Sequence, residues 1–184
     1  MDGKAAEARY EEARAFLTMR VAKDGTSSVQ VEGVQPRRVP LLPRVVRDIR
    51  FEFDDAAHGF LPAHDIADLR TENGLLKGTA TGVDPYMERY AVDVDGSAVK
   101  TIRLRLKVSA GGGAQFYWIT QQSPGWAEDK AVHFPIIADN QFHEYVLSVG
   151  KHPLWNGQRI TTIRLDPTGG AQGATFEVDW IRGE

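Results

Sequence analysis

The stretch TIRLRLKVS at positions 101–109 alternates apolar and basic residues without interruption. Its apolar positions are Ile102, Leu104, Leu106 and Val108, and the basic positions between them are Arg103, Arg105 and Lys107. A period of two is typical of a β-strand with one buried face and one polar face. Residues 160–166 repeat the alternation and carry Arg164 on the polar side. They predict a companion strand whose arginine joins the same cationic sheet surface.

Short β-prone runs separated by turn residues fill the rest of residues 50–184. The expected strands are 50–53, 68–73, 75–81, 86–92, 100–109, 114–120, 131–136, 142–149, 159–166 and 174–181. Asn73-Gly74 is a strong hairpin dipeptide between the second and third of these. Strands at a spacing of about 8–12 residues predict an all-β, antiparallel sandwich or barrel.

The first 49 residues have a different pattern, which predicts a separate segment. Residues 4–19 are rich in Ala, Glu and Arg with apolar residues at helical spacing, and they predict a short amphipathic helix. Asp24-Gly25 predicts a small hairpin, and the three prolines of residues 35–44 predict an extended connector. The expected domains are therefore 1–49, the helix and its linker, and 50–184, the β-sandwich.

Composition excludes several classes of protein. The formal net charge of −3 excludes a globally basic nucleic-acid-binding protein, and the absence of cysteine excludes disulfides and thiolate metal sites. No apolar run approaches the length of about 20 residues that a membrane-spanning helix needs. The start lacks the apolar core of a signal peptide. The expected location is extracellular or periplasmic if the chain is a module of a secreted protein, and cytoplasmic if the chain is complete.

The order of short motifs in residues 50–182 resembles a known family. These motifs include Leu76-Lys77-Gly78, Asp84-Pro85-Tyr86, Phe116-Tyr117-Trp118, His143-Glu144-Tyr145, Trp155-Asn156-Gly157, Ile163-Arg164-Leu165-Asp166-Pro167 and Val178-Asp179-Trp180. Together they resemble the jelly-roll, galactose-binding-like domains that act as carbohydrate-binding modules of bacterial glycan-processing proteins. The resemblance implies an antiparallel jelly-roll β-sandwich, a glycan or polysaccharide as the partner, and an adjacent catalytic domain in a longer chain.

The ligand-binding candidates are basic and aromatic side chains. Arginine offers a planar fork of donors, and an aromatic ring stacks on the apolar face of a sugar. The candidates are Arg103, Arg105, Arg164, Tyr117 and Trp126. Their cationic character predicts an acidic or sulfated polysaccharide. The alternative is an ordinary solvated sheet face on which these cations pair with carboxylates such as Glu144 and Asp166.

The sequence also bears on metal binding and catalysis. The resemblance implies a structural calcium where the terminal strands meet, with Glu52, Asp54 and Asp179 as candidate ligands, because carboxylate oxygens suit Ca²⁺. The five histidines lack the spacing of a zinc site, and no nucleophile elbow or phosphate-binding loop is present. The expected function is a non-catalytic glycan-binding module. The alternatives are a structural sandwich packed on an enzyme domain and a small polysaccharide lyase or hydrolase with paired carboxylates.

Overall fold

The structure is a computed structural model that describes residues 17–21, 27–31, 37–39 and 44–184. The chain divides into two compact units, Met1–Leu42 and Pro43–Glu184, so the division lies ahead of the expected boundary at residue 50. In the first unit, β1 (Leu17–Val21), β2 (Ser27–Val31) and β3 (Arg37–Val39) form an antiparallel sheet in that order. Within the described ranges, no helix is long and apolar enough to cross a membrane.

The described strands of the first unit bear on three expectations. β1 pairs with β2 from Leu17↔Val31 to Val21↔Ser27, which confirms the hairpin. Most of the expected helix lies outside the described residues, but its last three positions, 17–19, belong to β1. Within the expected extended connector, residues 37–39 form β3, a short strand and therefore an extended segment, and the connector's other residues before Arg44 lie outside the described residues. β3 lies at the edge of its sheet.

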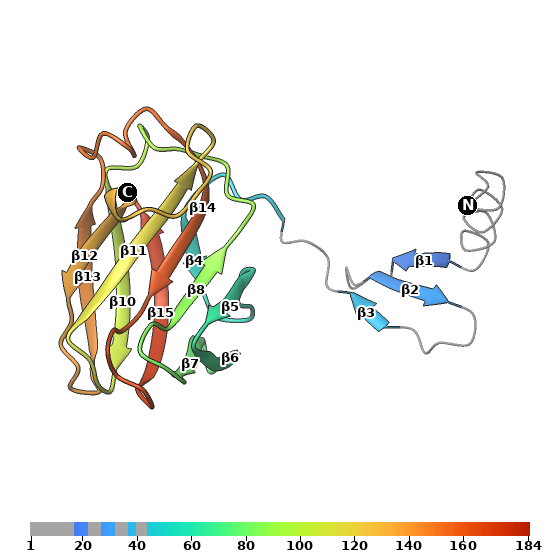
Figure 1. The fold of residues 1–184 in the computed structure, drawn as a ribbon, viewed down its shortest axis with the longest axis horizontal. Helices are drawn as coiled ribbons and strands as arrows, with labels where there is room; N and C mark the ends of the chain where they lie inside the picture. Colours follow the sequence, from blue (N-terminus) through green and yellow to red (C-terminus); the bar gives the residue numbers. More distant parts are fainter. Residues whose placement is uncertain (1–16, 22–26, 32–36, 40–43) are drawn as a thin grey trace, which may run out of the picture. The chain divides into compact units, whose positions relative to one another are not determined.

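The second unit is a sandwich of two antiparallel sheets (Figure 1). The β10 sheet has the order β13-β10-β15-β7-β6, with β4 also paired to β15. Its strands are β13 (Phe142–Ser148), β10 (Thr101–Val108), β15 (Thr175–Gly183), β7 (Leu75–Ala80), β6 (Ile66–Glu72) and β4 (Arg50–Glu52). The all-β expectation for this part of the chain is confirmed.

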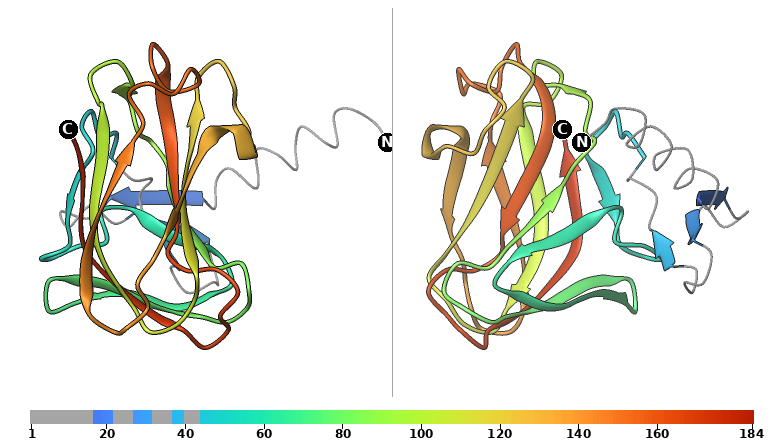
Figure 2. Two further views of the ribbon diagram at one scale, coloured as in Figure 1. Left: turned by 90° about the vertical axis from the view of Figure 1, so that its left-hand side faces the viewer. Right: turned by 45° about the vertical axis from the view of Figure 1, so that its right-hand side comes forward.

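The opposite layer is the β11 sheet, with the order β12-β11-β14-β8-β5 and with β9 also paired to β14. Its strands are β12 (Ala131–Pro135), β11 (Gly113–Thr120), β14 (Arg159–Asp166), β8 (Tyr86–Arg89), β5 (Phe60–His64) and β9 (Val94–Asp95). A single 3-10 turn, η1 (Glu128–Lys130), precedes β12. Figure 2 shows the two layers from other sides.

The core fills the space between the sheets with the apolar residues that the alternation predicted. Ile102, Leu104 and Leu106 of β10 are at most 1% exposed, as are Ile163 and Leu165 of β14. Trp118 and Trp155 are fully buried with their rings edge to face, 5.2 Å between centroids. Their indole N–H groups donate to backbone carbonyls, of Leu154 at 2.7 Å and Val99 at 3.0 Å, so neither polar group is buried without a partner.

The expectation that the two arginine-bearing strands share one sheet surface is wrong. β10 pairs with β13 and β15, whereas β14 pairs with β11, β8 and β9, so the strands belong to different layers. Because both strands direct their apolar residues into one core, their polar residues face away from each other. Arg103 and Arg105 therefore lie on one outer face of the sandwich, and Arg164 lies on the other.

A chain that begins at Pro43 should unfold cooperatively with a midpoint close to that of the full chain. The residues after Pro43 belong to the sandwich, because Arg89 donates to the Arg44 carbonyl at 2.6 Å and Val46 donates to the Ala91 carbonyl at 3.0 Å. A chain that begins at Asp48 should lose about 1–3 kcal/mol, because the buried Arg89 guanidinium then lacks this acceptor. Urea denaturation of the three chains measures both effects. A large loss already at Pro43 would show that the first unit supports the sandwich.

Candidate functional site

The charged side chains on the outer face of the β10 sheet form cross-strand ion pairs. Each basic residue of the opening alternation faces a carboxylate on a neighbouring strand. The pairs are Arg103–Glu144 at 2.9 Å, Arg105–Asp179, Lys107–Glu177 at 3.2 Å and, next to them, Arg182–Glu52 at 2.8 Å. This surface is therefore the alternative that the sequence left open, a solvated sheet face on which the cations pair with carboxylates. It leaves no cationic strip there for an anionic ligand.

The same pairs involve two of the three expected calcium ligands. Glu52 accepts two hydrogen bonds from Arg182, at 2.8 and 2.9 Å, and Asp179 accepts one from Arg105. Asp54 is exposed and belongs to no such pair. Among residues 44–184, no three His, Asp or Glu side chains are grouped so as to hold a metal ion. Calcium at these residues stays a prediction, without support from the arrangement of the side chains.

Arg164 lies at the centre of a polar network on the outer face of the β11 sheet. Its Nε and Nη2 donate to the two carboxylate oxygens of Asp166, at 2.6 and 2.5 Å, and Nη2 lies 3.6 Å from a carboxylate oxygen of Asp84. The guanidinium also covers two aromatic rings, with centroids 3.5 Å away for Tyr86 and 4.7 Å away for Tyr117. Three groups on β14, β8 and β11, together with Asp84 from the loop before β8, thus fix one planar cation in place.

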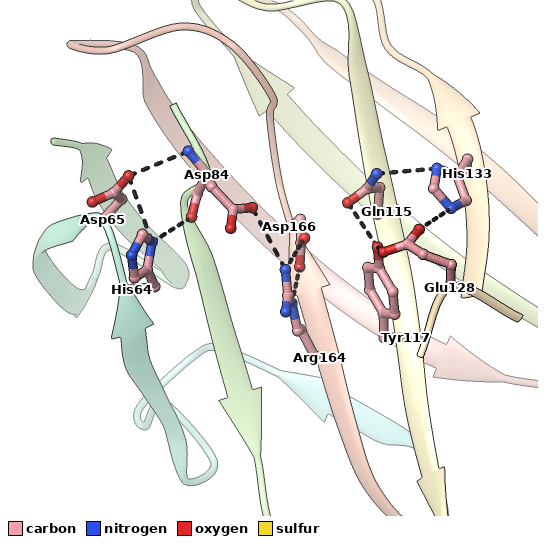
Figure 3. A network of polar contacts seen from close by, with 9 residues as sticks. All are labelled: His64, Asp65, Asp84, Gln115, Tyr117, Glu128, His133, Arg164 and Asp166. Carbon is pink, nitrogen blue, oxygen red and sulfur yellow. Dashed lines mark hydrogen bonds and ion pairs between the residues drawn. The ribbon is translucent and has the colours of Figure 1, made fainter. Parts of the chain in front are cut away.

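The network continues across the sheet to either side of Arg164 (Figure 3). Toward β5, the His64 ring stacks on Tyr86 at 5.4 Å between centroids and an interplanar angle of 10°. His64 Nδ1 lies 3.0 Å from the Asp84 carbonyl oxygen. The polar side chains of β5, β8 and β14 therefore form one continuous row.

Toward β12, the row ends in a closed set of hydrogen bonds. Tyr117 donates to Glu128 at 2.9 Å and lies 3.2 Å from Oε1 of Gln115. The Gln115 amide donates to Nδ1 of His133 at 3.0 Å, so Nε2 of the neutral imidazole holds the proton facing Glu128 at 3.3 Å. Burial and the neighbouring Glu128 raise the pKa of Tyr117, which keeps its hydroxyl protonated.

Trp126 covers the middle of this face from a loop. Its ring centroid lies 6.0 Å from the Arg164 guanidinium and 6.4 Å from the ring centroid of Tyr117. The loop is held by Lys130, a buried lysine whose ammonium donates to the Ser123 carbonyl and hydroxyl, both at 2.8 Å. Trp126 is thus a half-buried, positioned ring rather than a mobile loop residue.

A pocket of about 590 Å³ opens at one end of the network. Its polar lining comes from the side chains of Asp84, Gln115, His133 and Asp166. Its walls come from the glycine-rich turn at residues 112–113 and from the turn at residues 168–169. Donors and acceptors that are already oriented by one another therefore border an open hollow.

Two carboxyl groups on this face have raised pKa values. Burial raises the pKa of Asp166 to about 6, against the opposing effect of its ion pair with Arg164. Burial also raises the pKa of Glu88, which is 5% exposed and accepts a hydrogen bond from Tyr90. Burial lowers the pKa of Arg164, but the hydrogen bonds to Asp166 outweigh it and the guanidinium stays charged.

The Asp166 carboxyl should titrate near pH 6, not near its ordinary value of 3.8. Because the folded pKa exceeds the unfolded one, the folded state holds the proton more tightly. The contribution of Asp166 to the free energy of unfolding is therefore greatest below about pH 4 and falls as the pH rises to about 6, by up to about 3 kcal/mol. Carboxyl ¹³C NMR measures the pKa, and the difference in stability between wild type and Asp166→Asn across this range isolates the residue. A midpoint below pH 4.5 would contradict it.

The structure brings together three of the five predicted ligand-binding residues. Arg164, Tyr117 and Trp126 meet on the outer face of the β11 sheet, whereas Arg103 and Arg105 lie on the opposite face. The sequence did not identify four site residues, Tyr86, Asp84, Gln115 and His133. Asp166 was expected only as an ion-pair partner of the cations. Alternation within β11 and β14 does place Gln115 with Tyr117 and Asp166 with Arg164. The sequence does not show which strands are neighbours in the sheet.

The fold is similar to those of solved carbohydrate-binding modules. A non-crystalline-cellulose-specific module, CBM28, is 15% identical, with 76% of this chain and 98% of that chain covered and a TM-score of 0.52. A CBM29-2 mutant is 12% identical, with 73% of this chain and 89% of that chain covered and a TM-score of 0.50. A second CBM29-2 mutant, complexed with cellulohexaose, is 11% identical, with 75% of this chain and 92% of that chain covered and a TM-score of 0.50. No family model and no curated relative matches the sequence. The chain has the β-sandwich fold of carbohydrate-binding modules.

Proposed function

We propose that this protein is a non-catalytic carbohydrate-binding module and that the outer face of the β11 sheet binds the glycan. The observation that carries the proposal is the pocket bordered by Gln115, His133 and Asp166, whose polar atoms are fixed by the network around Arg164. On the opposite face, the charged groups of β10 are paired with carboxylates of the neighbouring strands.

The chemistry of this face suits a sugar. Sugar hydroxyls need both donors and acceptors, and the amide, imidazole and carboxylates of the pocket supply them. Side chains that are ordered before binding lose little entropy when the ligand arrives. The exposed parts of the Tyr86 and Trp126 rings offer apolar surface for the C–H face of a sugar ring. The similarity in fold to cellulose-binding modules supports the same class of ligand.

The finer expectations gain no such support. An acidic or sulfated polysaccharide was expected from Arg103, Arg105 and Arg164, and each of these cations has a carboxylate partner. The proposal therefore extends to glycan binding only. The neighbouring catalytic domain and the location of the protein stay predictions.

Isothermal titration of the full chain tests the proposal with hexasaccharides of β-1,4-linked glucose, xylose and mannose. At least one should bind with a dissociation constant between about 1 μM and 1 mM, which is −8 to −4 kcal/mol. Simultaneous replacement of Gln115 and His133 by alanine should abolish the measurable heat. If no neutral or acidic glycan binds, the structural role beside another domain is the better account.

Enzymatic hydrolysis is a second candidate, because Glu88 and Asp166 both have raised pKa values on the same face. Both residues are nearly inaccessible, however, since Glu88 is 5% and Asp166 4% exposed, and Asp166 is held by Arg164. A reducing-end assay on the bound polysaccharide distinguishes the two functions. A steady release of reducing ends that Glu88→Gln removes would establish an enzyme.

A further inference from the structure

We propose that this face accepts uncharged glycans and rejects anionic ones, and that Asp166 is the residue that sets this selectivity. The inference rests on the proposed function, because it concerns which glycan the same pocket takes. The most direct interpretation of Arg164 is the opposite one, in which an arginine on a binding face binds the carboxylate or sulfate of an anionic sugar.

Two of the three guanidinium nitrogens of Arg164 already donate to Asp166. These two nitrogens, Nε and Nη2, form one edge at which an anion could make a bidentate contact. Tyr86 and Tyr117 lie against the guanidinium, and only 11% of the Arg164 side chain is exposed. An anionic sugar would have to displace the Asp166 carboxylate, whose side chain is 5% exposed. That step would leave a buried carboxylate without its counter-charge, which is costly.

The surrounding charge also opposes an anion. Of the nine residues in Figure 3, four are Asp or Glu and one is Arg. Asp84 and Asp166 line the pocket itself, and Glu128 lies at the end of the network. A carboxylated or sulfated sugar therefore meets net negative charge, whereas the hydroxyls of an uncharged sugar find acceptors in the same carboxylates.

The experiment compares glycans with the same backbone and different charge at pH 8. Affinity electrophoresis and titration are run on the full chain with hydroxyethyl cellulose against carboxymethyl cellulose, and with methyl-esterified against de-esterified polygalacturonan. Asp166→Asn keeps the shape of the side chain and removes its charge, and Asp84→Asn removes a second charge from an exposed position. Asp139→Asn is the matched control, because Asp139 pairs with His143 at the end of the opposite sheet.

We expect the wild type to prefer the uncharged member of a pair at least about tenfold, a difference of 1.4 kcal/mol. Asp166→Asn should reduce that preference at least about fivefold, Asp84→Asn should reduce it less, and Asp139→Asn should leave it unchanged. Salt of about 0.5 M should narrow the wild-type preference, because it screens repulsion.

Two results would overturn the inference while leaving the proposed function intact. One is equal or tighter binding of the anionic member by the wild type. The other is a preference that neither Asp166→Asn nor Asp84→Asn changes while both variants remain folded. If no charged or uncharged polysaccharide binds at all, the proposed function fails, and the inference fails with it.

Discussion

Leu104→Ala should lower the free energy of unfolding by about 2–5 kcal/mol. Leu104 is fully buried in the middle of β10, between β13 and β15 and against the opposite layer. Alanine removes three carbon atoms and leaves a cavity, and the two flanking strands restrict collapse of the sheet around it. Denaturation in urea, followed by tryptophan fluorescence and circular dichroism, measures the change.

The matched control is Arg103→Ala, one residue away on the outer face. Arg103 pairs with Glu144 at 2.9 Å, but both side chains are well exposed, so the loss should stay below about 1 kcal/mol. The two adjacent substitutions should thus differ severalfold. Similar losses for both would mean that β10 does not present one face to the core and one to water.

Trp126→Ala should weaken glycan binding at least about tenfold, or 1.4 kcal/mol, with little change in the unfolding midpoint. The substitution removes the ring that covers Arg164 and Tyr117, and it leaves the Lys130 contacts that hold the loop. Titration with the hexasaccharide that binds the wild type best measures the loss.

Two variants show whether the loss of affinity comes from the aromatic ring and whether the ligand binds the outer face of the β11 sheet. Trp126→Phe keeps an aromatic surface and should recover part of the affinity. Arg105→Ala alters the opposite face, where Arg105 pairs with Asp179, and should bind as the wild type does. A strong effect of Arg105→Ala with none of Trp126→Ala would place the ligand on the β10 sheet.

The alternation of β10 and β14 was enough to predict their strands, their buried faces and the two-layer class of fold. It contains no information on which strands become neighbours, because each alternating strand is compatible with either sheet. That is why Arg103, Arg105 and Arg164 were expected on one surface and lie on two. Long-range pairings such as Tyr117↔Arg164 create the site, and no local pattern encodes them.

Local irregularities limited the prediction in a second way. Trp180 alternates with Phe176 and Val178 in the sequence, which predicts that all three are in the core. The register shifts between Arg105 and Leu106, so Trp180 pairs with Arg105 while Ile181 pairs with the core residue Leu104. Trp180 therefore lies on the outer side, where the Arg182 guanidinium is 4.2 Å from its ring centroid. A β-bulge of this kind reverses the faces of every residue after it.

The measurement that tests the central claim most directly is a ¹⁵N NMR titration of the full chain with the best-binding hexasaccharide. Binding on the outer face of the β11 sheet predicts saturable shifts at the side-chain amide of Gln115, the indole N–H of Trp126 and the backbone amides of β8, β11 and β14. The amides of β10, β13 and β15 should shift little. Shifts concentrated around Arg103, Arg105 and Glu144, with Gln115 and Trp126 unchanged at saturation, would contradict the account.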